Sequence, residues 1–139
     1  MIATETARRL RDAGLHWQPE PGDRFAVLDR GIDREVFMLS EMTVEVHDIG
    51  EHRLFGFNGT TEWAMDSVEE RDSVWLPREG QLRALLAGTF RSLGRDGEQW
   101  RVDIEVNGTP ISIADPDPEE AYAQALLRLL LAGSGSDRQ

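Results

Sequence analysis

Cysteine and lysine are both missing from this chain of 139 residues. The lack of cysteine excludes disulfide bonds, thiol nucleophiles and zinc–thiolate sites. All 15 basic residues are arginine, so no side chain can form a Schiff base or act as the lysine of a phosphate-binding P-loop. The two absences exclude several common routes to covalent and nucleotide-dependent catalysis.

Long apolar runs are also missing. No uninterrupted apolar stretch is longer than four residues, the length of the run 129–132, whereas a helix needs about 18 or more to span a bilayer. The first nine residues lack the apolar centre of a secretory signal. We therefore expect a cytoplasmic protein that makes no use of a membrane.

Positive charge is in short supply as well. The 15 arginines face 26 acidic residues, which gives a formal net charge of −11 and an isoelectric point near 4.6. Nucleic-acid binding depends on clustered cations that displace counterions from phosphates. We therefore predict no nucleic-acid partner.

Two segments in the first two thirds of the chain carry helix signals. The first begins with Thr4 as a good N-cap and ends before Gly14, which favours the left-handed C-terminal position. The second is predicted near 78–88, opened by Pro77 at its first position and closed by a glycine. Its periodicity directs three leucines inward: Leu82, Leu85 and Leu86.

The last helix has the clearest signals. Asp117 is the expected N-cap, Pro118 the first helical residue and Glu120 the third, close to a capping box. Its inner stripe is apolar: Tyr122, Ala125, Leu126, Leu129 and Leu130. Leu127 and Leu131 widen the stripe beyond one face. We therefore expect this helix to be either deeply buried or shared with a second copy in a homodimer.

The remaining signals are those of strands and tight turns. Apolar or alternating runs predict strands at 24–28, 35–39, 42–49, 53–57, 89–93, 100–106 and 111–113, with a turn at 94–97. Asn-Gly pairs at 58–59 and 107–108 predict type I′ hairpin turns. The predicted fold is α+β: a single domain over 1–132, followed by a flexible tail over 133–139. A mainly antiparallel sheet of about five to seven strands is covered by the last helix and the helix near 78–88.

Histidine is the natural residue to test for metal or acid–base chemistry. His47 and His52 flank Asp48 and Glu51, which are possible oxygen ligands. Their spacing spans a turn, however, and a divalent site normally needs three or four converging ligands. We interpret this segment as a strand end in solvent, and we predict no metal, no cofactor and no catalytic residue.

The segment 58–78 is the first place to look for a binding surface. It holds five acidic residues, two arginines and two of the four tryptophans. Tryptophan and arginine are enriched at binding hot spots, although large aromatic side chains are more often buried in a core. The connection between Met65 and Val74 also looks long and irregular. The candidate partner-binding residues are Glu62, Trp63, Asp66, Trp75 and Arg78.

These patterns leave three functional hypotheses. The first is a non-enzymatic interaction module that binds an unknown protein partner. The second is a carboxylate-based hydrolase or small-molecule-binding domain whose site lies near 58–78, which requires converging acids of raised pKa. The third, in which the acidic surface mimics a nucleic acid, rests on the net charge alone.

A family resemblance covers nearly the whole chain. The chain contains PGDRF at 21–25, EVHD at 45–48, GFNGTTEWA at 56–64 and WLPR at 75–78. Together with the acidic start and leucine-rich body of the last helix, these runs resemble a group of small acidic actinobacterial proteins, often labelled pilus assembly protein CpaE. Authentic CpaE-type proteins resemble MinD-like ATPases, whose P-loop needs a lysine, and this chain departs from that pattern. The resemblance implies no catalytic residue.

Overall fold

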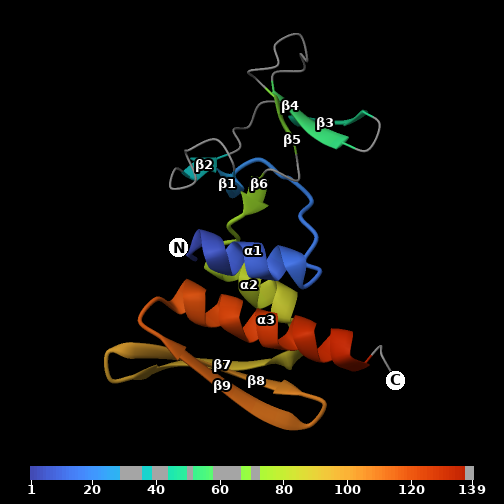
Figure 1. The fold of residues 1–139 in the computed structure, drawn as a ribbon. Helices are drawn as coiled ribbons and strands as arrows, with labels where there is room; N and C mark the ends of the chain where they lie inside the picture. The colour runs from blue at the N-terminus through green and yellow to red at the C-terminus, as the bar shows by residue number, and fades with distance from the viewer. Residues whose placement is uncertain (29–35, 39–43, 50–51, 58–66, 70–72, 137–139) are drawn as a thin grey trace. The chain divides into compact units, whose positions relative to one another are not determined.

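The computed structural model describes residues 1–28, 36–38, 44–49, 52–57, 67–69 and 73–136. Their contacts divide the chain into two compact units. Unit 1 consists of Met1–His16 and Pro77–Gln139, and unit 2 is Trp17–Leu76. Helices and antiparallel strands are both present, and the C-terminal helix packs on a sheet, which confirms the α+β class (Figure 1). The prediction of one domain over 1–132 stays a prediction.

Helix α1 (Thr4–Asp12) opens unit 1. Its N-cap position is Ala3, so Thr4 is the first helical residue and not the cap that we predicted. The predicted C-terminal end is confirmed: Gly14 has a φ of 110°, and the N–H of Leu15 donates to the carbonyl of Leu10 at 2.9 Å. This hydrogen bond belongs to the Schellman motif, which satisfies carbonyls left free at a helix end.

Helix α2 (Glu79–Leu86) confirms the helix predicted near 78–88, with two corrections. Arg78 occupies the N-cap position, so Pro77 precedes the helix instead of opening it. Leu82 and Leu86 are buried, whereas Leu85 is exposed. The buried pair is spaced i, i+4 on one helical face, and Leu85 lies off this face.

Helix α3 (Pro118–Ser136) begins as predicted. The Asp117 carboxylate accepts the backbone N–H of Glu119 at 2.9 Å, which is an N-cap hydrogen bond. The helix continues to Ser136, into the segment 133–139 for which we predicted a flexible tail. Its first half is buried on nearly every side, at Ala121, Tyr122, Ala123, Ala125 and Leu126.

Strands β7 (Phe90–Asp96), β8 (Gln99–Val106) and β9 (Thr109–Asp115) form a three-stranded meander, and they overlap the strands predicted at 89–93, 100–106 and 111–113. Asn107 and Gly108 have φ values of 51° and 80°, as a type I′ turn requires, so this hairpin prediction is confirmed. The other turn is displaced. β7 runs to Asp96, into the turn predicted at 94–97, because its pairing with β8 continues to the pair Asp96–Gln99.

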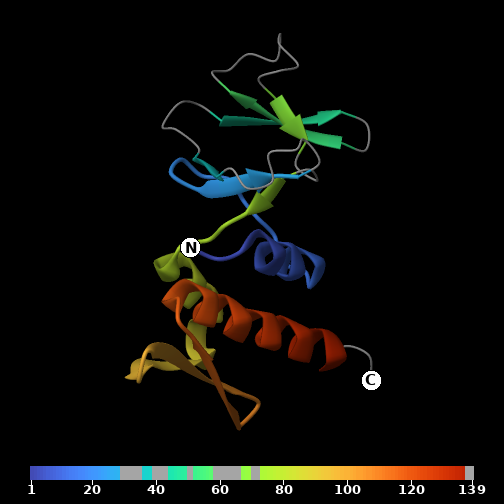
Figure 2. The same ribbon diagram turned by 60° about the vertical axis from the view of Figure 1, so that its left-hand side comes forward.

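Unit 1 has three layers, with α3 in the middle. Figures 1 and 2 show the β7–β9 sheet on one side of α3 and the helices α1 and α2 on the other. The contacts agree: α3 packs on β8 and β9, and also on α1 and α2. The predicted deep burial of the last helix is therefore confirmed for its first half.

The strands that the structure describes in unit 2 form two antiparallel sheets of three strands each. One sheet has the order β2-β1-β6, formed by β1 (Arg24–Val27), β2 (Val36–Met38) and β6 (Ser73–Trp75). The other has the order β3-β4-β5, formed by β3 (Val44–Ile49), β4 (His52–Phe57) and β5 (Ser67–Glu69).

The sheets differ from the prediction in number and in two strands. The single sheet of five to seven strands was wrong, because the described strands of the chain fall into three separate sheets. β5 and β6 lie in the connection that we interpreted as irregular, and each is only three residues long. The Asn-Gly pair at 58–59 lies outside the described residues.

The type I′ turn generates the first prediction. Gly108→Ala places a β-carbon at a φ of 80°, with no atom within 4 Å to clash. The loss therefore comes from backbone conformation alone, and we expect the free energy of unfolding to fall by about 1 kcal/mol in urea denaturation. Gly94→Ala, in β7 and equally open, is the matched control and should not destabilise the protein. Equal losses in both variants would contradict the assignment.

Candidate functional site

The structure separates the predicted partner-binding residues. Glu62, Trp63 and Asp66 lie outside the described residues. Trp75 belongs to β6 in unit 2. Arg78 belongs to unit 1, where its backbone N–H donates to the side-chain oxygen of Gln81 at 2.9 Å. Arg78 therefore takes part in starting α2, and Trp75 is the one described candidate in unit 2.

Trp75 is part of an aromatic cluster in unit 2, made of Trp17, Phe25, Phe37 and Trp75. The strand register aligns Phe25 of the central strand β1 with Phe37 of β2 on one side and with Trp75 of β6 on the other. The rings of Phe25 and Phe37 are 5.7 Å apart. Trp17 lies 5.7 Å from Phe25 and stacks on Trp75 at 6.5 Å, with only 8° between the ring planes.

A buried carboxylate fixes the position of Trp17. Asp23 is buried, and its Oδ2 atom accepts the indole N–H of Trp17 at 2.9 Å and the backbone N–H of Glu20 at 3.1 Å. A buried carboxylate of this kind needs donors to compensate for its lost hydration. Through these contacts, Asp23 holds the turn that begins at Glu20 against the aromatic cluster.

Trp75 lies at the boundary between the core of unit 2 and its surface. Trp75 is half-buried, and its indole N–H is buried and donates to no described acceptor. Phe25 and Phe37 lie within the predicted strands 24–28 and 35–39. Their place in these strands was a signal from which their packing in a core could have been predicted. Trp17 lies in a connecting segment, and only the folded pairing of β1 with β6 brings it onto Trp75.

The opposite face of β2 is apolar and exposed. Side chains alternate along a strand, so Val36 and Met38 lie on the face opposite Phe37. Their exposed fractions are 40% and 65%. Within the described part of the chain, β2 pairs on one side only, with β1, and is therefore an edge strand. We call the exposed side chains of Val36 and Met38 the β2 surface.

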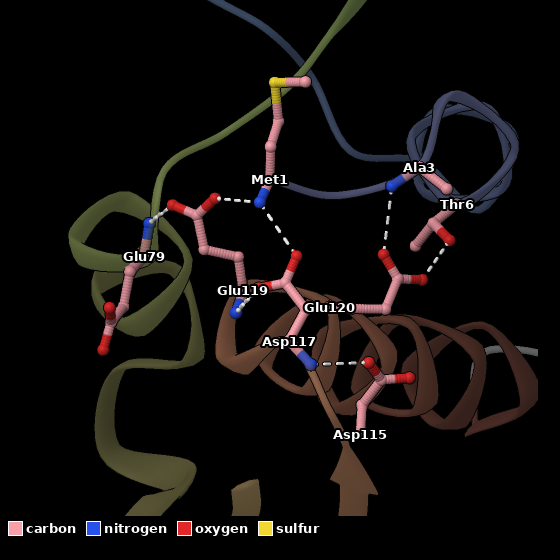
Figure 3. Close-up of polar contacts among 8 residues, drawn as sticks. All are labelled: Met1, Ala3, Thr6, Glu79, Asp115, Asp117, Glu119 and Glu120. Carbon is pink, nitrogen blue, oxygen red and sulfur yellow. Dashed lines mark hydrogen bonds and ion pairs between the residues drawn. The ribbon is translucent and has the colours of Figure 1, made fainter. Parts of the chain in front are cut away.

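A second polar arrangement lies at the N-terminus of α3 in unit 1. Figure 3 shows how three acidic side chains of this region receive donors from other segments. Asp117 and Glu119 lie 2.8 and 3.0 Å from the amino group of Met1. Glu119 also accepts the backbone N–H of Glu79, at the start of α2. Glu120 accepts the backbone N–H of Ala3 and the hydroxyl of Thr6.

These contacts tie the first turns of three helices together. Acidic side chains are favoured at helix N-termini, where the backbone N–H groups are free and the helix dipole is positive. Partial burial alone would lower the pKa of the Met1 amino group, but its hydrogen bonds to Asp117 and Glu119 outweigh that effect and raise the pKa. The acids at the start of α3 therefore act in packing helices.

The exposed face of the β7–β9 sheet carries one carboxylate with several donors. Asp103 accepts hydrogen bonds from the hydroxyls of Ser112 and Ser92 and from Arg101. The bond from Ser112 is the main cause that lowers the pKa of Asp103. A carboxylate that is ionised at neutral pH, with its oxygens occupied by donors, is a weak general base.

The two central histidines lie in neighbouring strands. The register pairs His47 of β3 with Leu54 of β4, and Ile49 of β3 with His52 of β4. Among the residues that the structure describes, no group of three histidine, cysteine or acidic residues is arranged to hold a metal ion. None of the described helices has the length and apolar character needed to cross a membrane.

No family model, curated protein or solved structure matches the chain. The resemblance to small acidic actinobacterial proteins rests on the sequence runs given above and stays a prediction. So does the hydrolase or ligand site near 58–78, because only residues 67–69 and 73–78 of that segment are described.

The Met1 amino group generates the second prediction. A pKa raised by folding stabilises the protein fully below the ordinary value of about 8, and this contribution is lost as the pH rises through the folded-state pKa. The chain has no lysine or cysteine, so few other groups titrate there. We expect the free energy of unfolding to fall by about 0.5 kcal/mol between about pH 7.5 and 9.5, because the pair is partly exposed.

Urea denaturation across this pH range tests the assignment. Combining Asp117→Asn with Glu119→Gln removes both negative charges that face the amino group and should flatten the pH dependence. Glu98→Gln, at an exposed turn of the β7–β8 hairpin, removes a charge without touching Met1 and should leave the dependence unchanged. A wild-type profile that matches the double variant would contradict the role of the amino group.

Proposed function

We propose that this chain is a non-enzymatic interaction module that acts in the cytoplasm by binding another protein. The proposal rests on one observation, the β2 surface. Val36 and Met38 are large apolar side chains, and they stand exposed on an edge strand whose other face is anchored by Phe37 in the aromatic cluster. An edge strand with exposed apolar side chains is a template on which a strand of another chain can pair.

The energetics of the β2 surface favour a partner. Fully burying a side chain such as valine or methionine contributes about 1.5–3 kcal/mol, and much of that gain is still available at Met38, which is 65% exposed. An edge strand also offers unpaired backbone donors and acceptors, to which another strand can pair. A partner strand would gain both contributions at one place, which is the mode called β-augmentation.

The third prediction tests this function. Met38→Glu places a charge in the centre of the β2 surface. In a pull-down after crosslinking, we expect this variant to lose the protein partners that the wild-type chain captures. Leu85→Glu is the matched control, because Leu85 is also an exposed apolar side chain, on α2, and lies in unit 1. Circular dichroism checks that both variants stay folded. If both variants capture the same partners as wild type, the β2 surface has no binding role.

We further propose a homodimer through the second half of α3. Leu131 is 53% exposed, and three neighbouring leucines are only half-buried: Leu127, Leu129 and Leu130. Arg128 is the one charged residue between 121 and 136, so two copies would bring little like charge together there. Burial of these leucines against a second copy would complete the apolar stripe that unit 1 covers only over its first half.

The fourth prediction concerns the mass in solution. We expect light scattering coupled to gel filtration to give the mass of a dimer at micromolar concentration, and Leu131→Glu to give a monomer. Met38→Glu lies outside α3 and should leave the mass unchanged, so that each proposed surface serves as the control of the other. A wild-type chain that is monomeric at this concentration would contradict the dimer.

A further inference from the structure

Negative charge is distributed unevenly between the two units. Unit 2, Trp17–Leu76, holds 14 acidic residues and five arginines and therefore has a net charge of −9. Unit 1 holds 12 acidic residues and 10 arginines, a net charge of −2. Nearly all of the net charge of −11 thus belongs to the unit that carries the β2 surface.

This charge restricts what can occupy the edge of β2. Electrostatic complementarity selects partners and speeds their association, whereas like charges oppose it. A second copy that docked edge to edge would bring two units of charge −9 together. A partner segment rich in arginine or lysine would instead be attracted.

The strand itself restricts the shape of the partner. Among the described strands, β2 is a short edge strand, paired on one side with β1, with its two exposed apolar residues two positions apart. An added strand would meet them with residues spaced by two, because side chains on one face of a sheet alternate. Arg24, which the register pairs with Met38, is half-buried and interacts within the chain.

We propose that unit 2 binds a basic, extended segment of a partner protein, which pairs with β2 as an additional strand. Alternate apolar residues of the segment cover Val36 and Met38. The intervening arginine or lysine side chains lie on the opposite face of the added strand, and their charge is attracted by the net charge of −9 of unit 2. This inference rests on the proposed interaction function and adds to it the chemistry and conformation of the partner.

Fluorescence anisotropy with synthetic peptides tests the inference on the full chain. The probe is a labelled peptide of about ten residues in which valine and arginine alternate. Three matched peptides accompany it. One replaces arginine by glutamate, one has the same composition arranged in two blocks, and one has N-methyl groups on alternate backbone nitrogens, which removes donors needed for strand pairing.

We expect the alternating valine–arginine peptide to bind at least about tenfold more tightly than each matched peptide. Raising the salt concentration from about 50 to about 300 mM should weaken it by about tenfold. Met38→Glu should weaken binding even though it adds a negative charge, because it disrupts the apolar contact. Leu85→Glu adds the same charge in unit 1 and should leave the affinity unchanged.

Three kinds of result would overturn the inference. Equal binding of the block or N-methylated peptide would reduce the interaction to charge attraction without strand pairing, and equal binding of the glutamate peptide would remove the role of charge. Failure of all four peptides would also overturn it. In that case, partners captured by the wild-type chain and lost in Met38→Glu would still support the interaction function, whereas their absence would refute both.

Discussion

The enclosure of the first half of α3 determines how unit 1 is built. The helix is contacted by β8 and β9 on one side and by α1 and α2 on the other, so its residues are buried around most of its circumference. Small side chains at Ala121, Ala123 and Ala125 allow neighbours to approach on both sides, while Tyr122 and Leu126 fill the remaining space. Close packing of this kind leaves no room for a charge along the buried half.

The acidic groups of this helix lie at its start. Asp117, Glu119 and Glu120 accept donors from Met1, from the first turn of α1 and from the first turn of α2 (Figure 3). In unit 1, the acidic groups that converge are therefore explained by helix capping and packing. In unit 2, by contrast, apolar side chains remain exposed on strand β2.

Local signals were enough to predict the elements whose geometry depends on a few neighbouring residues. The N-cap at Asp117, the end of α1 at Gly14 and the hairpin turn at Asn107 are of this kind. The division into three sheets was beyond prediction, because it depends on pairings such as Phe25 with Trp75, which are far apart in the chain. Residue type alone was enough to name Trp75 as a candidate binding residue. Its contact with Trp17 could not be predicted, because it also depends on pairing between distant parts of the chain.

The uneven charge links the packing of unit 2 to its proposed role. Self-repulsion among excess negative charges destabilises a compact state, and the −9 of unit 2 is spread over only 60 residues. The aromatic cluster, with Asp23 holding Trp17, supplies apolar burial that opposes this repulsion. A basic partner would reduce the repulsion directly, and ligands that bind the folded state stabilise it. Binding at β2 is therefore expected to add to the stability of unit 2, and salt should reduce this added stability because it screens the attraction between the partner and the unit.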